Sequence, residues 1–124
     1  MKIVLLVIGK TSERYLLDGL FKYQKRLQHY IQFEIFEIPN IKKVKNISNI
    51  ELMKKEGAII IAKIQPSDYV ILLDNKGQEF TSLRFADKLQ SWQLSGKKRL
   101  VFVIGGAYGF SEDLNRIANG SLSL

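Results

Sequence analysis

Two points of the chain place residues suited to ligand binding directly after an apolar run. In "VFVIGGAYG", Val101–Ile104 is followed by Gly105 and Gly106, and in "VILLD", the run ends at Leu73 and Asp74. Ligands of an open parallel sheet bind beyond the carboxyl ends of its strands. Glycine at such an end lets a ligand approach the backbone, because no side chain intervenes. If the two strands are neighbours, we expect both points to face one crevice.

The spacing of these glycines excludes two common phosphate-binding loops. "GGAYG" does not match the dinucleotide fingerprint Gly-x-Gly-x-x-Gly, and no Gly-Lys-Ser or Gly-Lys-Thr follows it. Glu112 and Asp113 fall in the first turn of the helix predicted after Ser111, which disfavours an anion at that helix end. The pattern favours a neutral or cationic small molecule, and the alternative is a tight turn without a ligand.

Two polar residues near these turns leave alternatives open. Asp74 could accept a hydrogen bond from a ribose hydroxyl or neutralise a cation, but a turn aspartate that bonds its own backbone is the commoner case. Tyr108 could stack on a base, or it could cover the edge of the core. No residue in the chain is assigned as the catalytic base.

Metal chemistry is disfavoured by the residue types present. The chain has one histidine, His29, and no cysteine, which excludes zinc-thiolate and multi-histidine sites as well as disulfides. A serine–histidine triad is disfavoured as well, because His29 lies far from the glycine turn in sequence. We expect His29 on the surface. Asp18, Glu51 and Glu56 are expected on helix surfaces, where they form no cluster of metal ligands.

The hydrophobic pattern alternates between strands and helices. Continuous apolar runs are typical of strands buried on both faces, as in a parallel sheet. The predicted strands are Lys2–Ile8, Phe33–Ile38, Tyr69–Leu73, Leu100–Ile104 and a fifth that opens in 121–124. Helices are expected between them, starting near Thr11 or Ser12, at Ser48, at Thr81 or Ser82, and at Ser111. This is the pattern of an α/β domain with a mostly parallel sheet flanked by helices.

Several local signals set the helix boundaries. "SNIE" at 48–51 fits a capping box, in which the Ser48 hydroxyl accepts from a backbone amide, and this helix is expected to run to about Ile64. The segment 74–77, "DNKG", predicts a turn, and Gly96 predicts a helix stop. In the helix between them, Leu83, Ala86, Leu89 and Leu94 are expected in the core, and Trp92 either in the core or facing a partner.

The charge balance favours a polyanionic partner without requiring one. Nineteen lysines and arginines against twelve acidic residues give a net charge of +7, and basic residues bind phosphates by releasing counterions. A solvated basic surface explains the same excess. The lysine-rich segment 40–46 likewise predicts an RNA contact or a solvated loop. The short apolar start and the lack of any membrane-length apolar run predict a soluble cytoplasmic protein.

Six stretches in one order resemble the RlmH family of SPOUT methyltransferases. They are "KIVLLVIGK", "YQKRL", "FEIFEIP", "KKEGAIIIAKI", "VILLDNKGQEFTS" and "FVIGGAYGF". The resemblance covers 1–124 as one domain, and the ordered set is far more specific than any single stretch. It implies an enzyme that uses S-adenosylmethionine to methylate N3 of a pseudouridine in large-subunit (23S) ribosomal RNA. It also implies a homodimer and a deep trefoil knot.

The resemblance places the cofactor against three backbone segments. The first matches Leu73, the second matches Gly106 with Gly105 beside it, and the third follows the start of the fifth strand. In the family, "SLSL" is followed by a knot-forming loop, a long helix and a basic tail. We therefore expect residues 1–124 to form a SPOUT-like domain that is incomplete at its carboxyl end. Two alternatives remain: a non-catalytic basic α/β module that binds ribosomal RNA, and a small nucleotide-binding protein without an RNA partner.

Overall fold

The structure is a computed structural model that describes residues 2–8, 25, 32–39, 47–79, 82–105 and 109–123. The elements in chain order are β1 (Lys2–Ile8), β2 (Gln32–Ile38), α2 (Asn49–Ala62), β3 (Tyr69–Glu79), α3 (Ser82–Leu94), β4 (Arg99–Ile104), α4 (Glu112–Ile117) and β5 (Gly120–Ser123). The helix expected from Thr11 or Ser12, apart from the helical residue Lys25, lies outside the described residues. So do Asp18, His29 and the segment 40–46.

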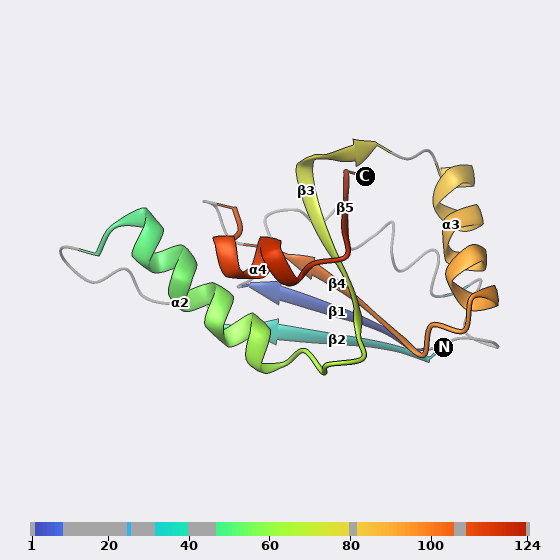
Figure 1. Ribbon diagram of the computed structural model, residues 1–124, viewed down its shortest axis with the longest axis horizontal. Helices are drawn as coiled ribbons and strands as arrows, with labels where there is room; N and C mark the ends of the chain where they lie inside the picture. Colours follow the sequence, from blue (N-terminus) through green and yellow to red (C-terminus); the bar gives the residue numbers. More distant parts are fainter. Residues whose placement is uncertain are drawn as a thin grey trace.

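The five strands form one sheet in the order β2-β1-β4-β3-β5, and every neighbouring pair is parallel. This confirms the α/β fold class. After their first residue, β1 and β4 are buried along their whole length, as their continuous apolar sequences predict. β2 lies at an edge of the sheet and is partly exposed, which is consistent with the two glutamates in its sequence. In Figure 1, β3 and β5 cross the other three strands at a steep angle.

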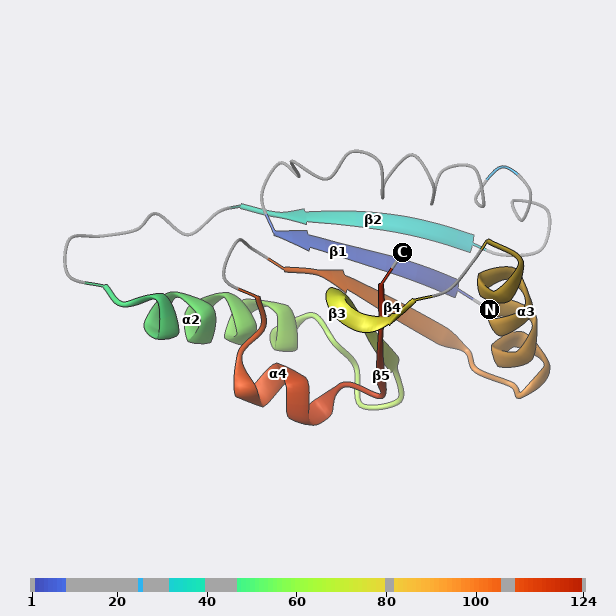
Figure 2. The same cartoon turned by 90° about the horizontal axis from the view of Figure 1, so that it is seen from above.

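The helices divide between the two faces of the sheet, and the direction of each connection decides which face it takes. The connections β2–β3 and β4–β5 run toward the β5 edge and carry α2 and α4, whereas β3–β4 runs back and carries α3. Right-handed crossovers place oppositely directed connections on opposite faces. Figure 2 shows α2 and α4 together on one face of the sheet, and α3 near the end where β1 begins.

Each face of the sheet has its own hydrophobic core. Alternate strand residues such as Leu5 and Phe102 pack with Leu89 and Trp92 of α3, while the residues between them pack with α2 and α4. Trp92 is therefore a core residue, which settles the alternative left open by the sequence. Among the helices that the structure describes, none combines the length and the apolar character that a membrane span requires.

The predicted helix signals are confirmed where the structure describes them. The Ser48 hydroxyl accepts from the Glu51 amide at 3.1 Å, and the Ser111 hydroxyl accepts from the Leu114 amide at 3.2 Å. Gly96 has φ +80°, a conformation that favours glycine.

The core positions predicted for α3 have mixed outcomes. Leu89 is buried, as expected. The prediction for Leu94 is wrong: the residue is 81% exposed, at the last position of α3. The side chains of Leu83 and Ala86 lie outside the described part of the structure.

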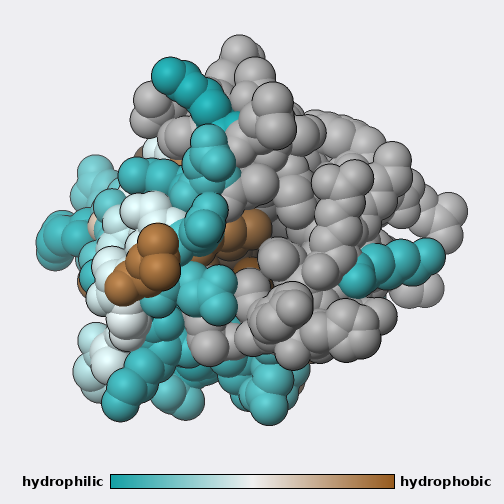
Figure 3. Space-filling model, turned by 90° about the vertical axis from the view of Figure 1, so that its right-hand side faces the viewer, coloured by the Kyte–Doolittle hydropathy of each residue, from teal (hydrophilic) through white to brown (hydrophobic). Residues whose placement is uncertain are grey.

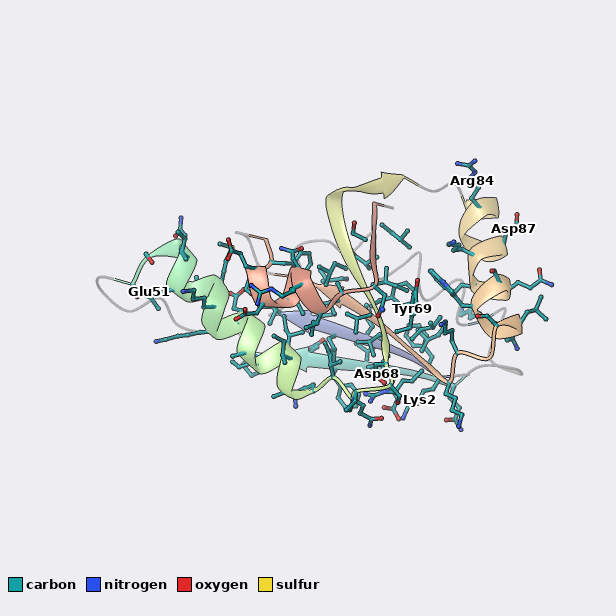
Figure 4. All side chains as sticks on the ribbon, in the orientation of Figure 1. Lys2, Glu51, Asp68, Tyr69, Arg84 and Asp87 are labelled. Carbon is teal, nitrogen blue, oxygen red and sulfur yellow. The ribbon has the colours of Figure 1, made fainter. Side chains whose placement is uncertain are left out.

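A buried ion pair joins β3 and β4 at the amino-terminal ends of the strands. The Asp68 side chain is fully buried, and its Oδ2 lies 3.2 Å from Nη1 of Arg99. The same oxygen accepts from the Gln65 amide at 2.8 Å, in the turn after α2. Figure 4 shows Asp68 and Tyr69 on the side of the sheet where β1 begins at Lys2. This pair holds the entry to β3 against the start of β4.

We expect Asp68→Ala to lower the free energy of unfolding by about 3 kcal/mol, because it leaves the largely buried Arg99 guanidinium without its carboxylate. Urea unfolding followed by circular dichroism measures the change. The control is Asp113→Ala, which removes an exposed ion pair with Arg116 and should cost less than about 0.5 kcal/mol. Equal losses in the two variants would contradict a structural role for the buried pair.

Candidate binding crevice at the carboxyl ends of the strands

The two points singled out in the sequence end on neighbouring strands. β3 and β4 pair in parallel, and Leu73 lies opposite Ile104, so Gly105 follows directly at the same edge of the sheet. The two strands are thus neighbours, as a shared crevice requires. Beyond this pair the chains part, because β3 leads to α3 on one face and β4 leads to α4 on the other. Such a switch in direction is where open α/β sheets bind ligands.

The segment 74–77 is not the predicted turn. β3 continues through it to Glu79, and its pairing with β5 is irregular: Leu122 lies opposite both Leu73 and Gln78. The four residues between them have no partner on β5 in this register. The "DNKG" residues thus form a bulge within β3 and do not end the strand in a turn. Backbone donors and acceptors at a bulge need other partners, and this bulge directly follows Leu73, at the candidate site.

Asn119 anchors the start of β5 to β3 at Val70, three residues before Leu73, although its role was not predicted from the sequence. Its side-chain Oδ1 accepts a hydrogen bond from the Val70 backbone N–H at 2.8 Å, and its backbone N–H donates to the Val70 carbonyl at 2.8 Å. This double contact precedes the ladder that puts Leu122 opposite Leu73. The available signal was an asparagine before glycine at a strand start, which indicates a turn residue able to bond nearby backbone.

A packing contact with Phe110, which the sequence did not reveal, leaves no room for a side chain at Gly105. A Cβ at this position would lie 2.7 Å from the ring of Phe110, so a core aromatic fills the space beside it on the face of α2 and α4. Any ligand must therefore approach this backbone from another direction. Gly109 has φ +89° and allows the return from β4 into α4. Gly106, Tyr108 and the side chain of Asp74 lie outside the described part of the structure.

Close packing against α2 positions α4 and the turn before it. Gly57 of α2 lies so near Ser111 that a Cβ there would come within 3.0 Å of the serine Cβ and nearer still to its Oγ. Ser111 is buried and caps α4. The absence of a side chain at Gly57 therefore sets how closely the start of α4 approaches α2.

Glu56, beside Gly57, is buried, so the prediction that it lies on a helix surface is wrong. It lies between Leu52 and Ile60 on the buried side of α2, and the residue is 8% exposed. Burial raises the pKa of the Glu56 carboxyl above its usual range. Glu51, as expected, is exposed. No group of three or more potential metal ligands gathers in the part of the chain that the structure describes.

The fold and the crevice together define a parallel α/β protein with a candidate small-molecule site at the diverging ends of β3 and β4. Comparison with known proteins extends this description. The family model described as "Predicted SPOUT methyltransferase" matches residues 1–124. The chain belongs to this family of SPOUT methyltransferases.

Several relatives align with this chain over its whole length. A protein of Parabacteroides distasonis is 49% identical over 124 residues, one of Cytophaga hutchinsonii is 46% identical, and one of Porphyromonas gingivalis is 41% identical. Each match covers 100% of this chain and 79% of the relative. All three relatives carry the name "Ribosomal RNA large subunit methyltransferase H".

We expect Gly57→Ala to destabilise the fold by about 1–3 kcal/mol, as overpacking of a tight contact does, although alanine alone favours a helix. Thermal unfolding measures the effect. The control is Lys55→Ala, which introduces the same residue at an exposed position of α2 and should change the stability by less than about 0.5 kcal/mol. A Gly57→Ala protein as stable as the parent would show that α4 does not depend on this contact.

Proposed function

We propose that this chain is an S-adenosylmethionine-dependent methyltransferase that modifies large-subunit ribosomal RNA at N3 of a pseudouridine. The observation that carries the proposal is the pairing of Leu73 with Ile104 at strand ends whose chains part to opposite faces. The names of the relatives support ribosomal RNA as the substrate. The pseudouridine and its N3 atom come from the resemblance of the sequence to the RlmH family.

The residues at the crevice fit this cofactor chemically. An adenine ring presents donors and acceptors along its edge, and the bulge after Leu73 has backbone groups without a ladder partner on β5. A sulfonium is cationic, and the first turn of α4 holds the exposed acids Glu112 and Asp113 rather than an anion-binding helix end. We assign Leu73, Gly105 and Gly106 to cofactor binding, with Gly105 contributing its backbone only.

The chain's part in the reaction is binding and alignment. When bound, S-adenosylmethionine supplies an electrophilic methyl group. The backbone at Leu73 and Gly105 would orient that ligand, and β5, anchored by Asn119, would bound the crevice on the other side of β3. Holding two reactants in line can supply a large part of the reduction in the barrier. The target imide must also lose its proton, and a general base adds about 10²-fold or more; we assign that role to no described residue.

The wider assembly follows from the same resemblance. We propose that residues 1–124 belong to one SPOUT-like domain, that the protein acts as a homodimer, and that a trefoil knot closes the cofactor site. A ribosomal RNA substrate places the protein in the cytoplasm. The matched relatives are longer than this chain, which covers 79% of each.

Methyl transfer tests the proposal directly. We expect label from methyl-labelled S-adenosylmethionine to enter large-subunit ribosomal RNA in ribosomes from cells lacking an endogenous enzyme of this kind. Nuclease digestion and mass spectrometry should place it on N3 of a pseudouridine. Gly106→Val should abolish cofactor binding by filling the space beside the backbone. Gly120→Val is the matched control, because nothing lies within 4 Å of a Cβ at Gly120.

Binding measurements with S-adenosylmethionine and with large-subunit ribosomal RNA separate the alternatives. RNA binding without affinity for S-adenosylmethionine would indicate a non-catalytic basic module. Cofactor binding without any salt-dependent RNA binding would indicate a nucleotide-binding protein. Equal cofactor affinity in the Gly106→Val protein and the parent would show that the site is misplaced.

A further inference from the structure

We propose that three lysines at the amino-terminal ends of the strands form a second RNA contact surface, which anchors the phosphate backbone of the substrate away from the crevice. These residues, Lys88, Lys97 and Lys98, are called the basic edge below. The inference rests on the proposed function, because it takes ribosomal RNA as the partner. It adds a surface at the end of the sheet opposite Leu73 and Gly105.

Contacts in the structure bring the basic edge together. The Lys2 amide donates to the Lys98 carbonyl at 2.9 Å, where β1 pairs with β4. Lys97 Nζ lies 4.9 Å from the ring centroid of Tyr69, and Lys88 Nζ lies 5.9 Å from that of Trp92. The two rings are themselves 5.7 Å apart. Lysines from α3 and from the loop before β4 thus flank one aromatic pair.

Two nearby carboxylates are paired with other cations. Glu34 pairs with Lys2 at 2.8 Å, and Asp68 pairs with Arg99. Asp87, next to Lys88 on α3, is exposed, but no ion pair joins the basic edge to a carboxylate in the described part of the chain. The basic edge thus carries three positive charges against one adjacent carboxylate, in a protein whose net charge is +7.

The environment of the basic edge suits a polyanion better than an apolar partner. Lys88 and Lys98 are exposed and Lys97 is partly exposed. Figure 3 views the side of the molecule that carries α3, and its described surface is mainly hydrophilic, with small hydrophobic areas. The aromatic rings restrict where the two flanking ammonium groups lie. Trp92 is 7% exposed and so cannot stack on a base, and Tyr69 is partly buried against the core; the ammonium groups are the exposed feature, and they suit phosphates.

The basic edge is too far from the proposed cofactor site to take part in methyl transfer, so its role is to bind the RNA. Parallel strands rise about 3.3 Å per residue, so the length of β1 separates the basic edge from the crevice by roughly 20 Å. Groups so far from the reacting atoms can hold the substrate but cannot touch its target base. Loss of the basic edge should therefore raise KM for RNA and leave kcat unchanged at saturating RNA.

The test compares two adjacent lysine pairs with the same charge. Lys97→Gln with Lys98→Gln removes two charges of the basic edge, and Lys54→Gln with Lys55→Gln removes two exposed charges from α2. Each double variant changes the net charge from +7 to +5. Affinity for a large-subunit ribosomal RNA transcript is measured by filter binding at about 50 to 300 mM KCl, a range in which phosphate contacts weaken steeply. Lys88→Gln, which removes one charge of the basic edge, shows whether the effect scales with the number of charges removed.

We expect the Lys97/Lys98 variant to bind on the order of tenfold more weakly at about 0.1 M salt, and its log–log salt slope to fall by about 1.5, since each lost phosphate contact removes about 0.7–0.9. Lys88→Gln should give about half that change in slope, and the Lys54/Lys55 variant much less. Equal effects of the two double variants would overturn the proposal, because only net charge would then matter. No RNA binding by the parent would overturn the proposed function itself.

Discussion

The parallel pairing of β3 with β4 is the constraint on which the rest of the structure depends. Leu73 lies opposite Ile104, and both strands are buried in the middle of the sheet, with side chains packed on two faces. Because right-handed crossovers send the following helices to opposite faces, the chain must open just beyond this pair. The proposed site thus follows from topology and requires few specialised side chains. A site built from backbone would suit the proposed cofactor, whose methyl group is already reactive, so that alignment supplies much of the rate.

The two ends of the same sheet differ in chemistry. At the carboxyl ends, a bulge in β3 leaves backbone groups without a partner on β5, Gly57 packs closely against Ser111, and Phe110 fills the space beside Gly105. At the amino-terminal ends, charges dominate: one ion pair is buried between β3 and β4, and the basic edge faces solvent. If both proposals hold, the length of the strands separates the cofactor site from a surface that attracts RNA through its phosphates, an attraction that falls with salt.

Much of this architecture could be predicted from the sequence, because continuous apolar runs and capping serines are local signals. Lys2–Ile8 matches β1 residue for residue, and Ser48 and Ser111 cap their helices as expected. The errors arise where tertiary contacts decide. The "DNKG" segment became a bulge because β5 pairs on both sides of it, and Glu56 is buried because α2 packs its inner side against the sheet and α4. Gly105 follows the end of β4 as expected, and its role in binding stays a prediction; only the fold reveals that Phe110 occupies the space beside it.

The most direct test of the central claim is an NMR titration of the ¹⁵N-labelled protein with S-adenosylmethionine. The amides of 73–77, Gly105 and Gly106 should shift on addition of the cofactor, since they belong to the diverging ends of β3 and β4 and the turn that follows. Those of Lys98 and Arg99, at the opposite end of the same strands, should stay in place. Shifts confined to the amino-terminal ends, or none at millimolar cofactor in a folded protein, would contradict the account.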